Sequence, residues 1–235
     1  MIQFLILTAE LTLLYFLSRW LTQTLYTFFL LIFKIRSIAM SLVTLLLFPG
    51  TVIHELSHLF VAEILGVRTG KLTLAPEEIR ETNVKAGSVT IAATDPIRRT
   101  LIGIAPVFTG IASLAALSYF TRGPLAVLQE DLLQNALIPA AYYYLLFAIS
   151  NSMFSSKQDL KGFWPVAIIV SCIITAGFLA GIRFGLTGQA AIIAEQIITS
   201  LIRSLAQVLA VNGGLLLVVS ILIALLRKLT NTTPA

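Results

Sequence analysis

Two histidines, the only two in the chain, stand four residues apart in the run His54-Glu55-Leu56-Ser57-His58. Residues four apart on a helix lie one turn above each other, so both imidazoles can reach one ion while Glu55 stands beside them as a base for water. Two imidazoles and a carboxylate are costly inside an apolar segment unless a partner satisfies them, and a zinc ion would satisfy all three. The run therefore predicts a catalytic zinc site with His54 and His58 as ligands and Glu55 as the general base.

A catalytic zinc ion takes three protein ligands and keeps one position open for water. With no third histidine and with the single cysteine, Cys172, in a later apolar run, we expect the third ligand to be a carboxylate. Glu63 would face away from the histidine stripe, and Glu77 and Glu78 fall in a hairpin region. Asp159 follows a predicted span on the membrane side of the histidines and is the expected third ligand. The alternative is that Asp159 is a solvated loop residue beside two lysines and binds no metal.

The composition of the chain is that of a membrane protein. Of its 235 residues, 57% are hydrophobic and only 11% charged, whereas a soluble domain devotes about a quarter to charge. The net charge of +5 comes without a basic cluster with interleaved aromatics, so we expect no nucleic-acid partner. We expect an all-α polytopic membrane protein with about six to seven transmembrane helices and a small interfacial β-hairpin.

Apolar runs locate the expected spans. The run from Ile2 to Phe33 is either one long tilted span or two short ones. The run from Ile38 to Leu65 is divided by Pro49-Gly50, so a new helix is expected near Thr51, whose hydroxyl can cap it. Further spans are expected at roughly 100–120, 133–151, 163–181 and 208–226.

The segments between these spans carry two weaker patterns. Residues 66–94 contain alternating β-prone pieces, which predict a β-hairpin at the membrane interface. Residues 189–207 repeat a polar residue every fourth position, which predicts an amphipathic helix that lies in the interface or extends the last span. Asn212-Gly213-Gly214 is expected to break the start of that span, as a hinge or a close helix contact.

The distribution of Lys and Arg among the segments that connect the expected spans predicts how the chain is oriented in the membrane. Segments 66–99, 152–162 and 227–235 carry six, two and two Lys or Arg residues. The opposite connections carry five, namely Lys34, Arg36, Arg122, Arg183 and Arg203. Ten against five places the first set in the cytoplasm. We therefore expect a multi-pass protein of a cell membrane with its site toward the cytoplasmic side. The compact chain favours a prokaryotic plasma membrane.

The order of these features resembles the site-2 protease family of intramembrane zinc metalloproteases. In that family a helix with HExxH is followed by a β-hairpin, a span entered through a Gly-Pro step, and a further span. An asparagine in that further span precedes the third ligand, an aspartate, by eight residues. Here Pro49 to Val67 matches the first element and Gly66 to Thr94 the hairpin. Asn151 precedes Asp159 by the same eight residues, so the similarity covers about residues 49–162.

The resemblance implies a minimal enzyme without a PDZ or CBS module. It implies a single transmembrane metalloprotease domain over 1–235, with a catalytic core at about 38–165, a β-hairpin at about 66–94 and additional helices at 1–36 and 163–230. Asn151 would donate a hydrogen bond to the developing oxyanion or to the substrate backbone, and the alternative is an interhelical hydrogen bond. The chain departs from the family pattern at Ser57, where glycine or alanine is usual, and in residues 154–162.

These features together predict an enzyme that hydrolyses peptide bonds of transmembrane protein substrates at the lipid bilayer. Zinc would activate water and Glu55 would accept its proton. The hairpin 66–94 would offer an edge strand to an extended substrate, or would be an interfacial cover. Two other classes stay open. One is a catalytically silent relative that binds membrane partners, and the other is an ion or proton transporter using the same polar residues.

Overall fold

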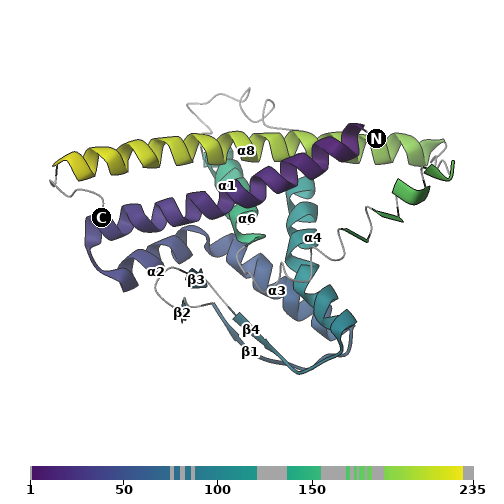
Figure 1. Cartoon of the computed structure of the whole chain (residues 1–235), viewed down its shortest axis with the longest axis horizontal. Coiled ribbons are helices and arrows are strands. Elements are labelled where there is room, and N and C mark those ends of the chain that lie inside the picture. The colour runs from purple at the N-terminus through teal and green to yellow at the C-terminus, as the bar shows by residue number, and fades with distance from the viewer. Residues whose placement is uncertain are drawn as a thin grey trace.

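The computed structural model describes residues 2–74, 77–79, 83–85, 88–120, 137–154 and 188–229, with short stretches between 168 and 181. Its helices are α1 (Ile2–Phe33), α2 (Arg36–Leu46), α3 (Phe48–Ile64), α4 (Pro96–Phe120), α6 (Leu137–Ser152) and α8 (Gln189–Leu229) (Figure 1). Strand β1 (Thr69–Thr73) pairs antiparallel with β4 (Ser88–Ile91), and between them β2 (Glu77–Ile79) pairs with β3 (Asn83–Lys85). The described residues therefore form the expected helical fold with a small β-hairpin.

Three described helices are long and apolar enough to cross a membrane, over Leu5–Phe33, Pro96–Leu117 and Ile192–Leu229. Helices α2 and α3 are bent by 76° across a short break, and they add a fourth span if the pair counts as one broken span. This set is consistent with a membrane protein, but the expected count of about six to seven spans is not confirmed. The expected span at 163–181 falls mostly outside the described residues.

Helix α3 buries polar side chains and exposes apolar ones. Leu56, Phe60 and Ile64 are 46%, 62% and 65% exposed, whereas His54 and His58 are 3% and 6% exposed. Water would favour the reverse, while lipid tails accept the apolar face and leave buried polar groups to be satisfied within the protein. The histidine face of α3 is therefore directed at other parts of the chain.

Helices α1 and α8 lie side by side and run in the same direction (Figure 1). Leu14 of α1 packs in one cluster with Leu205, and Leu25 packs in another with Val219. The C-terminal ends of both helices therefore lie together, with the basic residues Lys34, Arg36, Arg227 and Lys228. The charge count placed the first two of these residues opposite the last two, and the parallel packing groups all four instead.

The lengths of α1 and α8 decide between the alternatives expected for the first and the last apolar runs. Helix α1 is one unbroken helix of 32 residues, not two short ones. Helix α8 has 41 residues and spans about 60 Å, so residues 189–207 extend the last span. The expected break at Asn212-Gly213-Gly214 is wrong, because α8 continues through it. A Cβ at Gly213 or Gly214 would meet nothing within 4 Å in the described structure, so these glycines make no close helix contact.

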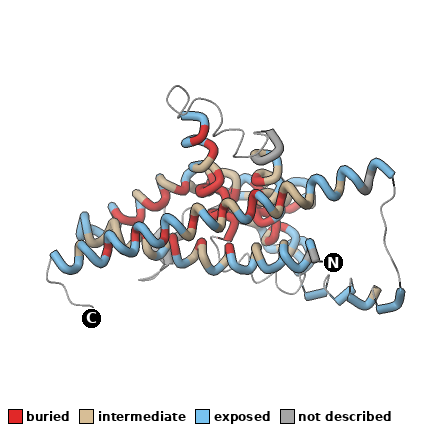
Figure 2. Tube along the Cα trace, turned by 90° about the horizontal axis from the view of Figure 1, so that it is seen from above, coloured by how far each residue is buried: buried red, intermediate tan, exposed pale blue. Residues whose placement is uncertain are grey.

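Helix α3 begins three residues before the expected start. Its first residue is Phe48, and Pro49 lies in the first turn, where a missing N–H costs nothing because that N–H has no partner in the helix. Thr51 does not cap the helix, since its hydroxyl donates to the carbonyl of Leu47 at 3.2 Å. Gly50 packs directly against the backbone of α6, where a Cβ would meet the carbonyl of Ala148. Buried residues gather in the middle of the molecule, where these helices meet (Figure 2).

Candidate metal centre

Helix α3 ends in a glycine turn that leads directly into β1. Gly66 has φ +68°, its N–H donates to Glu63 at 3.0 Å, and the N–H of Val67 donates to Ala62 at 2.8 Å. This pair of bonds is the Schellman motif, which favours glycine because the backbone is left-handed there. The side chains of Val67 and Ala62 are buried against Ile102 of α4. The turn therefore ties the histidine helix to both the hairpin and α4.

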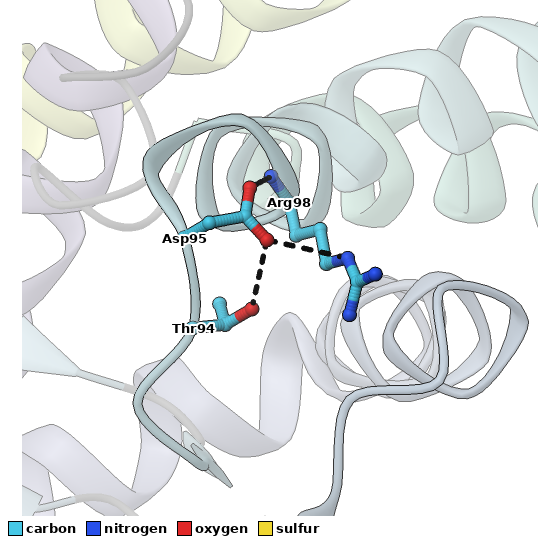
Figure 3. A network of polar contacts seen from close by, with 3 residues as sticks. All are labelled: Thr94, Asp95 and Arg98. Carbon is cyan, nitrogen blue, oxygen red and sulfur yellow. Dashed lines mark hydrogen bonds and ion pairs between the residues drawn. The ribbon is translucent and has the colours of Figure 1, made fainter.

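Helix α4 begins at a capped turn, shown in Figure 3. One carboxylate oxygen of Asp95 accepts the backbone N–H of Arg98 at 3.0 Å, and the other lies 3.2 Å from the Arg98 Nε. Thr94 donates its hydroxyl to the same carboxylate at 3.5 Å, and Pro96 takes the first helical position. The backbone hydrogen bond from Arg98, helped by the nearby guanidinium, lowers the pKa of Asp95 below its ordinary value. The cap fixes the turn from β4 into α4.

The two imidazoles of α3 converge on one point. The Nε2 atoms of His54 and His58 lie 3.3 Å apart, and the two rings are nearly perpendicular at 84°. Two nitrogens that each lie about 2.0–2.1 Å from a tetrahedral zinc ion are about 3.3–3.4 Å apart. The spacing of the pair therefore fits two ligands of one ion.

The other ring nitrogen of His58 has a backbone partner. Its Nδ1 lies 2.8 Å from the carbonyl oxygen of Ile102 in α4. A carbonyl only accepts, so Nδ1 carries the proton and Nε2 is the acceptor that faces Nε2 of His54; a metal would take the same lone pair. Metal-binding histidines usually make such a bond through their second nitrogen. Ser57 fits between the two histidines because its hydroxyl donates to the carbonyl of His54 at 2.6 Å.

A cavity of about 450 Å³ opens over the imidazole pair. Glu55, only 4% exposed, lines it together with His54 and His58. The other described lining residues come from β4, the segment after it and the first turns of α4, namely Val89, Ile91, Ala92, Ala93, Thr94, Arg99, Ile102 and Gly103. Strand β4 pairs with β1 on one edge, and no described strand pairs with its other edge. The carboxylate, the imidazoles and β4 thus border one space.

The expected third ligand, Asp159, lies outside the described residues, so its role stays a prediction. Within the described part of the chain, no three His, Cys, Asp or Glu side chains form a group that could hold a metal. Glu63 is exposed and belongs to no such group. Glu77 and Glu78 lie on β2, in the expected hairpin region, and their side chains are outside the described part.

Asn151 lies on α6 and makes an interhelical hydrogen bond. Its Nδ2 donates to the carbonyl of Phe147 at 2.7 Å and to the Oδ1 of Asn212 on α8 at 3.0 Å. Asn151 is not among the described residues that line the cavity. Its predicted contact with a substrate therefore stays a prediction, while its alternative, the interhelical bond, is present in the structure.

Sequence reasoning missed two residues that shape this region. The sequence predicts that Asn212 is part of a helix break, but Asn212 is fully buried and joins α8 to α6. Its signal was a carboxamide within an apolar run. Ile102 acts through its backbone carbonyl, which its residue type does not reveal.

No protein-family model, curated protein or solved structure matches this chain.

Proposed function

We propose that this chain is an intramembrane zinc metalloprotease that hydrolyses peptide bonds of transmembrane protein substrates. The observation that carries the proposal is the convergence of two imidazole Nε2 atoms at 3.3 Å in the cavity that Glu55 also lines. The resemblance to the site-2 protease family supports the same assignment. We place the protein in a prokaryotic plasma membrane, as a multi-pass protein with its site toward the cytoplasm.

The residues divide the chemistry between binding and proton transfer. His54, His58 and Asp159 would hold the ion. Zinc, when bound there, supplies Lewis acidity toward water and toward the carbonyl of a peptide bond. The Glu55 carboxylate accepts a proton from the attacking water, whose oxygen bonds to the carbonyl carbon. When the C–N bond breaks, Glu55 returns that proton to the leaving nitrogen, which leaves a carboxylic acid and an amine.

The position of β4 suggests how a substrate reaches this chemistry. A helical substrate hides its carbonyl groups in its own hydrogen bonds, so it must be extended before it can be cut. Strand β4 borders the cavity and has an edge that no described strand occupies. An extended segment could pair with that edge and pass in front of Glu55. This arrangement favours the substrate-binding role of the hairpin over an interfacial cover.

The test compares the wild-type protein with three variants. The full chain is purified in detergent, its zinc is measured by mass spectrometry, and it is incubated with a panel of transmembrane substrates. Glu55→Gln is expected to keep zinc and to lose at least about 100-fold in cleavage rate, because the general base is gone. His54→Gln is expected to lose both the bound zinc and the cleavage activity. Ser57→Ala is the matched control in the same helical turn and is expected to keep both.

Each other outcome contradicts part of the proposal or favours another function. Cleavage that survives Glu55→Gln would remove Glu55 from its proposed role. A wild-type protein that binds no zinc contradicts the metalloprotease. Zinc binding with no cleavage of any substrate favours a catalytically silent binding protein. Ion flux across liposomes without cleavage favours the transporter.

A further inference from the structure

Pro106 lies inside α4, one turn after Ile102, and is fully buried. In an α-helix the N–H of each residue donates to the carbonyl oxygen four residues earlier, which for position 106 is the oxygen of Ile102. Proline has no N–H, and its ring crowds the carbonyl of residue i−4. The Ile102 oxygen therefore lacks the donor that the helix would otherwise supply.

That same oxygen is the partner of the metal-site imidazole. His58 Nδ1 lies 2.8 Å from it, across 44 residues of sequence. The Ile102 side chain is 1% exposed and packs on Ala62 of α3 and on Val67, just after the glycine turn that ends α3. This packing holds the backbone of Ile102 close to α3. The same packing keeps the Ile102 carbonyl within hydrogen-bond distance of the imidazole.

We infer that Pro106 is a positioning residue for His58. It withholds the N–H that would occupy the Ile102 carbonyl and so reserves that oxygen for Nδ1 of His58. With its proton held at Nδ1, His58 directs the lone pair of Nε2 toward His54. The inference rests on the proposed function, because it concerns which nitrogen of His58 is presented to the ion. Pro106 acts through a backbone oxygen and touches neither ion nor substrate in this role.

Replacing Pro106 by alanine restores the missing N–H. The new donor competes with His58 for one oxygen, so the hydrogen bond from Nδ1 is weakened and both ring tautomers become accessible. Loss of such a partner typically weakens metal binding by 10–100-fold, and we expect about tenfold here because the carbonyl itself remains. Alanine favours helix, so the thermal midpoint of the variant is not expected to fall.

The first measurement is the affinity for Zn²⁺ of the full-length protein in detergent, by competition with a chromogenic chelator. Pro106→Ala is compared with Pro139→Ala, which removes another buried proline, in the first turn of α6. The N–H at that position has no acceptor within its own helix, so wild-type affinity is expected. The α-hydroxy analogue of alanine at position 106 lacks both the ring and the N–H. It is expected to bind Zn²⁺ nearly as tightly as wild type.

The second measurement is the ¹⁵N NMR spectrum of histidine side chains in the metal-free protein. The chain has two histidines, so the spectrum contains two imidazoles. Wild type and the α-hydroxy analogue are expected to show His58 protonated at Nδ1, and Pro106→Ala a mixture of tautomers. This readout needs no zinc. If no variant binds zinc but the tautomer changes as expected, the proposed function fails and the role of Pro106 stands.

Three results would overturn the inference. The first is an unchanged His58 tautomer in Pro106→Ala, whatever happens to the affinity. The second is an equal loss of zinc affinity in Pro139→Ala, which would make the effect a general one of removing buried prolines. The third is a loss of zinc affinity in the α-hydroxy analogue as large as that in Pro106→Ala. That result would assign the effect to the proline ring and not to the missing N–H.

Discussion

At the scale of single residues, the candidate site depends on which atoms of each side chain remain available. His58 commits Nδ1 to Ile102 and turns Nε2 toward His54, and Asn151 commits its amide N–H groups to Phe147 and Asn212. The types of His54, Glu55 and His58 predict metal binding and proton transfer, because imidazole and carboxylate have few other uses in an apolar helix, and these roles stay a prediction. The partners that orient them could not be predicted, because a backbone carbonyl is present at every position.

Asp95, outside the membrane-spanning part of α4, allows a residue-scale test of the turn beside the site. Its pKa is lowered in the folded protein by the Arg98 N–H and guanidinium. Such a carboxylate adds stability above its unfolded pKa of about 4, and this contribution is lost as pH falls through the lower folded value. Asp95→Ala is therefore expected to lower the thermal midpoint at neutral pH by about 2–4 °C, the size of one lost cap.

The measurement is thermal unfolding by circular dichroism across the acidic range. The gap between wild type and Asp95→Ala should narrow as the carboxylate of the wild type is protonated. A gap that stays constant down to the lowest pH would mean that the charge of Asp95 adds nothing to the cap.

At the scale of elements, the site is held by where helices begin, end and touch. The sequence predicted that α3, the hairpin and α4 exist, because hydrophobic period and turn residues are local signals. It misplaced the start of α3, because Pro49 serves equally as a break before a helix or as a residue of its first turn. It also placed a break at Gly213-Gly214, where α8 continues as one helix that packs along α1.

Two helix glycines with opposite surroundings make a matched pair of variants. A Cβ at Gly50 would meet the carbonyl of Ala148 and the hydroxyl of Ser152, one turn before His54. Gly50→Ala is expected to push α3 from α6, to destabilise the fold by about 1–3 kcal/mol and to weaken zinc binding. Gly214→Ala meets open space and is expected to leave stability unchanged or to raise it by up to about 1 kcal/mol.

Thermal unfolding and zinc affinity of both variants check this prediction. Equal effects of the two substitutions would show that the contact between Gly50 and α6 does not position the histidine turn.

At the scale of the whole molecule, the parallel packing of α1 and α8 changes the expected topology. If both helices span the membrane, Lys34 and Arg36 join Arg227 and Lys228 on one side. The basic residues of the connections then divide as twelve against three, a stronger asymmetry than ten against five. The bent pair α2–α3 would enter and leave on that same side, as a re-entrant loop. We predict that the C-terminal ends of α1 and α8 both lie in the cytoplasm.

Cysteine labelling in intact cells tests this topology in a Cys172→Ser background. Lys34→Cys and Lys228→Cys are expected to be protected from a membrane-impermeant thiol reagent added outside and to react after permeabilisation. Gln189→Cys, at the other end of α8, is the control and is expected to react directly. Labelling of positions 34 and 228 from opposite sides would contradict parallel spans.

The sequence alone determined the apolar character of the chain and the placement of two histidines one helical turn apart in the HELSH run. Both follow from residue types and from the fixed geometry of one helix, where residues four apart share a face. Tertiary structure alone decided that the Ile102 carbonyl meets His58, that Asn212 meets Asn151 and that α1 runs parallel to α8. The first two contacts join residues 44 and 61 positions apart, and no local pattern records such a distance in space. They arise because buried polar groups must find partners, and which partners lie within reach depends on the packing of all the helices together.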